Sequence, residues 1–199
     1  TDSVSIANLG GGFNFINNSN FNIKNLSVDN CKASSGAGLY IQNSKGSISD
    51  SSFTRNISTG NGGGIWMYLS DVKIDNTTLS ENNASNGGGI YVNGVLSNLE
   101  LDSVKVLKNK SVVGSGGGIY AYGSMTISGK NTVISDNIAN AYGGGVMIKT
   151  NGILNEGIIS DNLANGNSGG GLKIDGKLIM NGGTVRNNKA NTTGGGIDY

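Results

Sequence analysis

The chain has 199 residues with a net charge of +1, so no summed field draws it to nucleic acid or to an anionic membrane. It contains no His and one Cys, which excludes Ser-His-Asp and Cys-His nucleophiles, His- or Cys-based metal sites and an internal disulfide. No apolar run approaches the roughly 20 residues of a membrane-spanning helix. We therefore expect no nucleic-acid partner, no membrane insertion by this segment, no metal and no cofactor.

A glycine triplet followed by an apolar residue recurs from the first repeat to the last. The triplets start at Gly10, Gly36 (where the middle residue is Ala), Gly62, Gly87, Gly116, Gly143, Gly169 and Gly194, which are 25 to 29 residues apart. Gly and Asn make up about a third of the chain, a composition that is typical of disorder when it lacks a period. The strict period instead predicts a solenoid.

Each repeat carries three apolar marks. Inward and outward residues alternate after the triplet, as in Ile65–Tyr68. Further apolar residues stand near the middle of the repeat, such as Ile74, and shortly before an Asn that recurs once per repeat, such as Leu79. This predicts three short strands per coil and an all-β, right-handed parallel β-helix of about seven to eight coils. Leucine-rich repeats, nine-residue calcium repeats and left-handed hexapeptide helices do not fit the pattern or the period. We expect one solenoid domain, 1–199, cut from a longer solenoid.

One Asn stands about six residues before each triplet from the second onward. These residues are Asn30, Asn56, Asn82, Asn109, Asn137, Asn162 and Asn187. A buried polar side chain needs partners, so we predict an internal ladder in which each amide bonds turn backbone and the Asn of the next coil. Asn56 and Asn109 also lie in N-x-S/T triplets, but an inward side chain cannot carry a glycan.

The residue before each of these Asn forms a charged column: Asp29, Arg55, Glu81, Lys108, Asp136, Asp161 and Arg186. Coils stack about 4.8 Å apart, so alternating signs predict an exposed ion-pair ladder. Asp136 and Asp161 form its like-charge step, and two close carboxylates would raise one pKa or hold a cation. Simple surface acids are the alternative. The single Cys31 is expected to be a small, partly buried thiol rather than a reactive one.

A second column lies on the outward side of the first strand. It runs Asn14, Tyr40, Trp66, Tyr91, Tyr120, Met147, Lys173 and Asp198, with Tyr68 and Tyr122 two residues beyond it. The six aromatic residues Tyr40, Trp66, Tyr68, Tyr91, Tyr120 and Tyr122 predict an exposed stripe that binds a sugar or a protein. The alternative is that stacked rings only stabilise neighbouring strands.

The repeats resemble a known family of surface repeats. FTRN at Phe53–Asn56 and GGGI at Gly62–Ile65 are similar to the F-x-x-N and G-G-[AG]-[ILV] motifs of chlamydial polymorphic outer-membrane proteins and related bacterial and protist proteins. The aromatic residue of F-x-x-N is present only at Phe53; in the other repeats the place is taken by Leu79, Val106, Ile134 and Ile159, and by Thr184 in the last one. The resemblance implies a right-handed β-helix on a cell surface, often in adhesion, and brings no catalytic residues.

Three functions remain as hypotheses. The first is a non-catalytic extracellular or cell-surface scaffold of adhesin type, such as an autotransporter or outer-membrane passenger, that binds a host or neighbouring-cell protein or glycan. The second is a fibre subunit that self-associates end to end. The third is a polysaccharide lyase or hydrolase, which needs carboxylates on adjacent coils, and Asp136 with Asp161 is the only such pair in the charged column.

Overall fold

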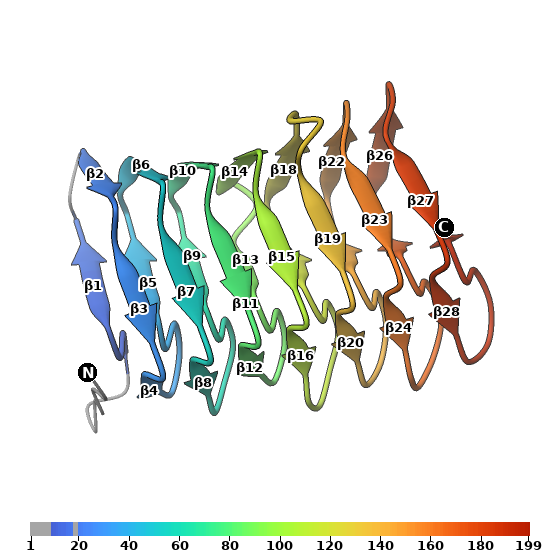
Figure 1. Cartoon of the computed structure of the whole chain (residues 1–199), viewed down its shortest axis with the longest axis horizontal. Coiled ribbons are helices and arrows are strands. Elements are labelled where there is room, and N and C mark those ends of the chain that lie inside the picture. The colour runs from blue at the N-terminus through green and yellow to red at the C-terminus, as the bar shows by residue number, and fades with distance from the viewer. Residues whose placement is uncertain (1–8, 18–19) are drawn as a thin grey trace.

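The computed structural model describes residues 9–17 and 20–199, and in these residues all regular structure is β. The strands stack into one elongated solenoid, with the first strand, Phe13–Ile16, at one end and the last, Ile197–Asp198, at the other (Figure 1). Every strand pairs in parallel with the equivalent strand of the next coil. The predicted all-β parallel solenoid is confirmed.

The strands form four parallel sheets that run the length of the molecule. The eight-stranded sheet contains β1 (Phe13–Ile16), β5 (Leu39–Gln42), β9 (Ile65–Tyr68), β13 (Ile90–Asn93), β17 (Ile119–Ala121), β21 (Val146–Ile148), β25 (Leu172–Ile174) and β29 (Ile197–Asp198). The second sheet contains β2 (Phe21–Lys24), β6 (Lys45–Ser49), β10 (Asp71–Asp75), β14 (Asn98–Asp102), β18 (Ser124–Ile127), β22 (Asn151–Leu154) and β26 (Lys177–Met180).

The other two sheets also have seven strands each. The third contains β3 (Ser27–Asp29), β7 (Ser52–Thr54), β11 (Thr78–Ser80), β15 (Lys105–Leu107), β19 (Val133–Ser135), β23 (Ile158–Ser160) and β27 (Thr184–Arg186). The fourth contains β4 (Lys32–Ala33), β8 (Ile57–Ser58), β12 (Asn83–Ala84), β16 (Lys110–Ser111), β20 (Ile138–Ala139), β24 (Leu163–Ala164) and β28 (Lys189–Ala190).

A coil therefore has four strands, and the expectation of three was wrong. The first three sheets correspond to the three apolar marks of the repeat. The strands of the fourth sheet are only two residues long, and their inward side chains are small, such as Ala84 and Ser111. Two residues are too few for an alternating pattern, so these strands carry no large apolar mark in the sequence.

Each of the first four coils turns at four corners where the backbone adopts the left-handed conformation, and the next three coils have two or three such corners. In the coil that starts at the second triplet these corners are Gly36 (φ 59°), Asn43 (φ 47°), Asp50 (φ 49°) and Arg55 (φ 52°). Gly has no Cβ penalty there, and Asn and Asp tolerate the conformation better than other residues do. Part of the richness in Gly and Asn thus follows from these corners.

The predicted Asn ladder is present, but its two ends were placed one residue too early. Its members are Asn56, Asn82, Asn109, Asn137, Asn162 and Asn188. The backbone N–H and Nδ2 of each of the first five donate to Oδ1 of the next member, at 2.9 to 3.0 Å. Nδ2 also donates to a backbone carbonyl of the preceding coil, as from Asn109 to Leu79.

Asn30 and Asn187 are corner residues with φ of 55° instead of ladder members. The structure aligns coils by their third strands, where Val28 pairs with Phe53, so Cys31 takes the place equivalent to Asn56. Cys31 is buried, and its backbone N–H donates to Asn56 Oδ1 at 3.0 Å. The stretch between ladder and triplet varies in length, so counting six residues back from Gly36 reaches Asn30 instead of Cys31. At the last coil the same count from Gly194 reaches Asn188, and the prediction took the adjacent Asn187 instead.

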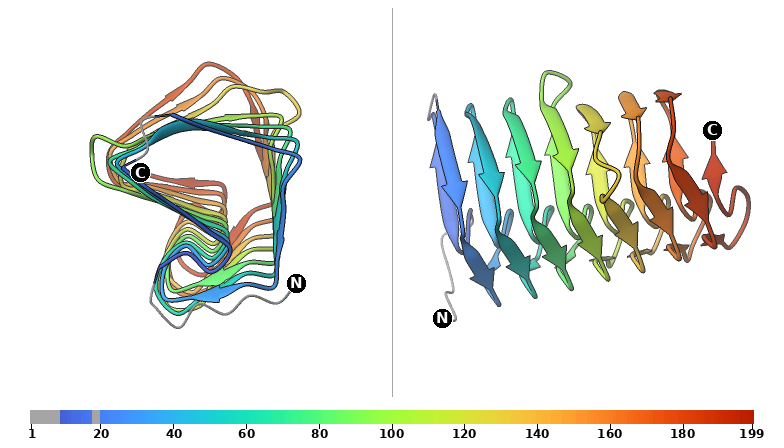
Figure 2. Two further views of the ribbon diagram at one scale, coloured as in Figure 1. Left: turned by 90° about the vertical axis from the view of Figure 1, so that its left-hand side faces the viewer. Right: turned by 45° about the horizontal axis from the view of Figure 1, so that its top comes forward.

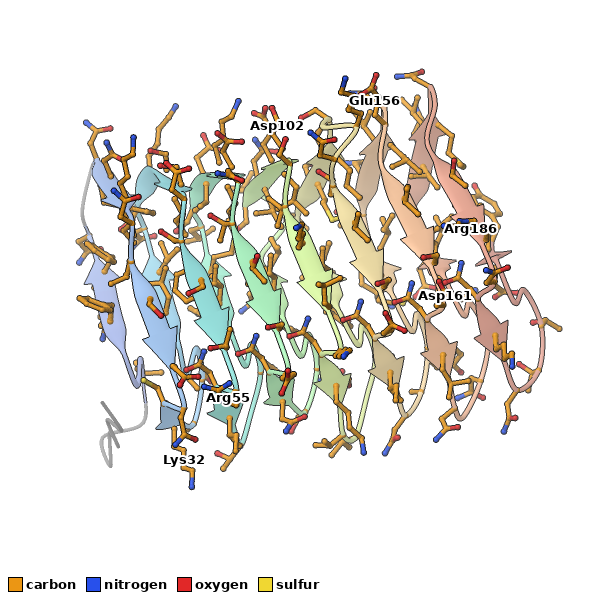
Figure 3. All side chains as sticks on the ribbon, viewed as in Figure 1. Lys32, Arg55, Asp102, Glu156, Asp161 and Arg186 are labelled. Carbon is orange, nitrogen blue, oxygen red and sulfur yellow. The ribbon has the colours of Figure 1, made fainter. Side chains whose placement is uncertain are left out.

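The charged column does not form a continuous ion-pair ladder. Among the described residues, the one ion pair that involves this column is Arg55 with Asp29. Asp29 is the last residue of its third strand and pairs with Thr54, so it lies one residue before the corner position that Arg55 occupies in its own coil. Arg55 and Asp161 lie on the outer surface, at the corner between the third and fourth strands of their coils (Figure 3). Other ion pairs run along the second sheet, as between Lys73 and Glu100 at 3.1 Å.

Candidate functional site on the concave face

The outward column of the first strand is in register through the whole solenoid. Tyr40 pairs with Trp66, Trp66 with Tyr91, and Tyr91 with Tyr120. The same row continues through Met147, Lys173 and Asp198. Strand alternation therefore places these side chains on one face of the eight-stranded sheet, as the sequence predicted.

This face is concave. The view along the long axis shows that the cross-section is indented on one side, with a narrow foot beside the body (Figure 2, left). The first glycine of each triplet lies against the outward column: a Cβ at Gly62 would come within 2.8 Å of Trp66 Cβ. The turn before each strand thus folds back along the column. We call the outward side of the eight-stranded sheet, together with these turns, the concave face.

The first two aromatic residues of the column are buried. Tyr40 is 4% exposed and Trp66 is 9% exposed, and their rings stack at a centroid distance of 4.3 Å and an interplanar angle of 8°. The Tyr40 hydroxyl donates to Gln42 Oε1 at 2.9 Å. The expectation of an exposed stripe is wrong for this pair, because the concave path of the chain covers residues that alternation alone would leave open.

The next two aromatic residues are partly open. Tyr91 stacks on Tyr120 at 4.9 Å and 16°. Burial raises the pKa of both hydroxyls above the ordinary value of 10.0. Tyr122 is exposed, and Tyr68 is half-buried with its ring tilted against Trp66 at 6.0 Å. The accessible aromatic surface therefore lies toward the middle of the molecule, from Tyr91 to Tyr122.

Beyond Tyr120 the concave face becomes ionic. Lys149 pairs with Asp175, and Lys173 bridges Asp175 at 3.7 Å and Asp198 at 2.7 Å. Hydrogen bonding to Asp175 raises the pKa of Lys149, and hydrogen bonding to Asp198 raises that of Lys173. The pKa of Asp198 falls to about 2, because Lys173, Ser168 and Thr193 all donate to it. Two cations and two carboxylates thus form one neutral chain of charges.

A cavity of about 450 Å³ opens where the aromatic and ionic parts meet. One side is the eight-stranded sheet with the residues that follow its strands, and the other is formed by the turns that precede the triplets. Its lining residues are Ser115, Tyr120, Tyr142, Met147, Lys149, Ser168, Lys173 and Asp175. An apolar base with a few convergent polar groups is the usual composition of a small-ligand site.

The longest coil, between Gly87 and Gly116, adds exposed aliphatic side chains at two places. The loop after β13 carries Val95 and Leu96, and the turn after β16 carries Val112 and Val113. Leu96 is 79% exposed and Val113 is 71% exposed. The second of these turns leads directly to Ser115, which lines the cavity.

Other candidate chemistry lies away from this face. Asp136 and Asp161 are exposed corner residues that line a separate hollow with Lys189. Within residues 9–17 and 20–199, no group of three or more Cys, Asp or Glu side chains is placed to hold a metal ion. The described part of the chain also contains no helix with the length and apolarity needed to cross a membrane.

Sequence reasoning found the column but not the cavity. Met147 and Lys173 stood in the predicted column, but the predicted binding stripe contained only its aromatic residues. Lys149 and Asp175 continue the row that contains Tyr68 and Tyr122. The alternation of residues after each triplet could therefore have predicted that these two side chains share the outward face. Tyr142 and the two serines belong to the turns, whose path depends on the fold and carries no such signal.

Comparisons with known proteins agree with this architecture. A family model described as "Right handed beta helix region" matches residues 11–190. No curated protein and no solved structure matches the chain. The match spans most of the chain and all four sheets. The chain therefore belongs to the family of right-handed beta helix regions.

Proposed function

We propose that the chain is a non-catalytic binding module of an extracellular or cell-surface protein, of adhesin type. It would bind a protein or glycan of a host or neighbouring cell through the concave face. The observation that carries the proposal is the register of the outward column, which gathers Tyr91, Tyr120 and Tyr122 beside a cavity on a rigid scaffold. Partly open aromatic residues of this kind are enriched at recognition surfaces.

The test compares binding of the labelled chain to cell surfaces before and after changes on this face. Tyr120→Ser combined with Tyr122→Ser removes open aromatic surface and leaves the buried Tyr40 and Trp66 pair intact. We expect binding to fall about tenfold or more, as is common for hot-spot residues. Ile153→Ser, which changes an outward residue of the second sheet, is the matched control and retains binding. Equal binding by all variants would contradict the proposal.

A polysaccharide-degrading enzyme is the second candidate, because Asp136 and Asp161 are adjacent carboxylates on an open surface with a hollow between them and Lys189. Such enzymes need two carboxylates within reach of one sugar. Turnover of any member of a polysaccharide panel that disappears in Asp136→Asn and in Asp161→Asn would favour this candidate over the binding module.

A further inference from the structure

The cavity beside Tyr120 has a lining that points to one chemical class of ligand. Met147, which is almost fully buried, lines it with an apolar side chain, and the phenol rings of Tyr120 and Tyr142 add apolar surface with a hydroxyl each. Ser115 and Ser168 contribute further hydroxyls from the turns. The cavity therefore offers an apolar patch surrounded by groups that donate and accept hydrogen bonds.

The charged groups that line the cavity already have partners, and together with Asp198, which lies outside the lining, their charges balance. Lys149 and Lys173 share Asp175, and Lys173 also holds Asp198. An anionic ligand would have to displace one of these carboxylates, and a cationic ligand would have to displace a lysine. Neither would gain a net opposite charge, so the cavity does not favour an ionic ligand.

A neutral polyol meets no such obstacle. Each hydroxyl can accept from an ammonium and donate to a carboxylate, so it inserts between Lys149 and Asp175 without leaving either charge unpaired. The C–H face of a pyranose ring can pack on Met147 and the aromatic rings. The row of Tyr91 and Tyr120 continues the face along the solenoid axis, which gives room for further sugar units.

We propose that this cavity binds an uncharged pyranose unit of a glycan, with Lys149, Asp175 and Tyr120 as the residues that recognise it. The inference rests on the proposed function and narrows its partner to a neutral glycan. It predicts binding that responds little to salt, because a neutral ligand gains no long-range attraction from the protein.

The experiment uses saturation-transfer NMR on the whole 199-residue chain with defined oligosaccharides. The probes are neutral gluco-, galacto- and manno-oligosaccharides, with uronic-acid and sulfated oligosaccharides of equal length for comparison. Lys149→Met with Asp175→Met removes the ion pair and keeps the net charge. Lys73→Met with Glu100→Met removes a comparable pair from the second sheet and is the control. Circular dichroism verifies folding, and Tyr120→Phe is a milder variant that removes only a hydroxyl.

The expected result is that a neutral oligosaccharide binds with little salt dependence, that the cavity double variant weakens binding about tenfold, and that the control does not. Binding of only the acidic probes, or neutral binding that survives both Tyr120→Phe and the cavity double variant, would overturn the inference. If no oligosaccharide binds while cell binding still depends on Tyr120 and Tyr122, the inference fails and the proposed function stands. If cell binding does not depend on Tyr120 and Tyr122, the proposed function fails.

Discussion

The ladder residues show how well the roles of single residues can be predicted from this sequence. The five interior members, Asn56 to Asn162, were predicted correctly because an Asn recurs at the repeat period and a buried amide must have partners. The first end was misplaced because the turn before the triplet varies in length, and at the last end the wrong one of the two adjacent residues Asn187 and Asn188 was chosen. Counting three residues from the inward residue of the third strand, Val28 or Val185, gives Cys31 and Asn188 and would have avoided the error.

Breaking the ladder in its middle is expected to destabilise the fold. Asn109→Ala removes the Oδ1 that accepts from two donors of Asn82, and it leaves the carbonyl of Leu79 without its amide donor. Buried groups left without partners cost about 1–3 kcal/mol each, so we expect a loss of about 3 kcal/mol or more in denaturant unfolding. Asn83→Ala, outside the ladder, is expected to change stability by less than about 0.5 kcal/mol. Similar losses for both would contradict the buried ladder.

Leu69 occupies a corner that suits another residue. Its φ is 48° and its side chain is 37% exposed, whereas the equivalent corner of the preceding coil is Asn43. A branched apolar residue in this conformation costs about 1 kcal/mol relative to Asn or Gly. Leu69→Asn is therefore expected to raise the free energy of unfolding by up to about 1 kcal/mol. A lower midpoint in a denaturant titration would show that the packing of Leu69 outweighs its strain.

The carboxyl of Asp198 ties the last strand to the concave face and makes this contact sensitive to acid. Its folded-state pKa is about 2, below the ordinary 3.8. The stabilisation is therefore fully present above 3.8 and is lost as the pH falls toward and through about 2. NMR titration should show this low pKa, and Lys173→Met should return it toward 3.8, because Lys173 is the largest cause of the shift. An unshifted titration in the parent chain would contradict the contact.

At the scale of the strand, the first three sheets were predictable and the fourth was not. Alternating apolar residues identify the long strands, whereas the short strands of the fourth sheet show only a small inward residue, Ala33, Ser58 or Ala84 in successive coils. Small side chains fit there because the narrow foot of the cross-section has little interior to fill (Figure 2, left). A recurrent Ala or Ser two residues after the ladder is the signal that could have revealed this strand.

The third glycine of each triplet is expected to be essential wherever another coil follows it. A Cβ at Gly118 would lie 2.7 Å from the carbonyl oxygen of Gly145 and 3.1 Å from the amide of Asn137. Gly118→Ala should therefore cost about 1–3 kcal/mol through overpacking. Gly196→Ala is the matched control, because the nearest atom to its Cβ would be 3.7 Å away. Equal effects in thermal unfolding would show that close stacking does not explain the triplets.

At the scale of the whole molecule, the indented cross-section decides what the outward column does. Alternation correctly predicted that Tyr40 and Trp66 point away from the core, but it cannot tell an open face from a concave one. That distinction depends on the path of the turns, which bring the first glycine of each triplet against the column. The same path creates the cavity beside Tyr120, so the most useful part of the candidate site follows from the fold rather than from any local motif.

The fold, the cavity and the proposed function all require that positions one coil apart are direct neighbours on the concave face. NMR measurement of ring-to-ring nuclear Overhauser effects tests this, and Trp66 is the single Trp of the chain, so its indole signals are unambiguous. The structure predicts strong cross-peaks between the Trp66 indole and the Tyr40 ring, and between the Tyr91 and Tyr120 rings. The absence of both sets of cross-peaks, or their replacement by contacts between positions out of register, would contradict the account.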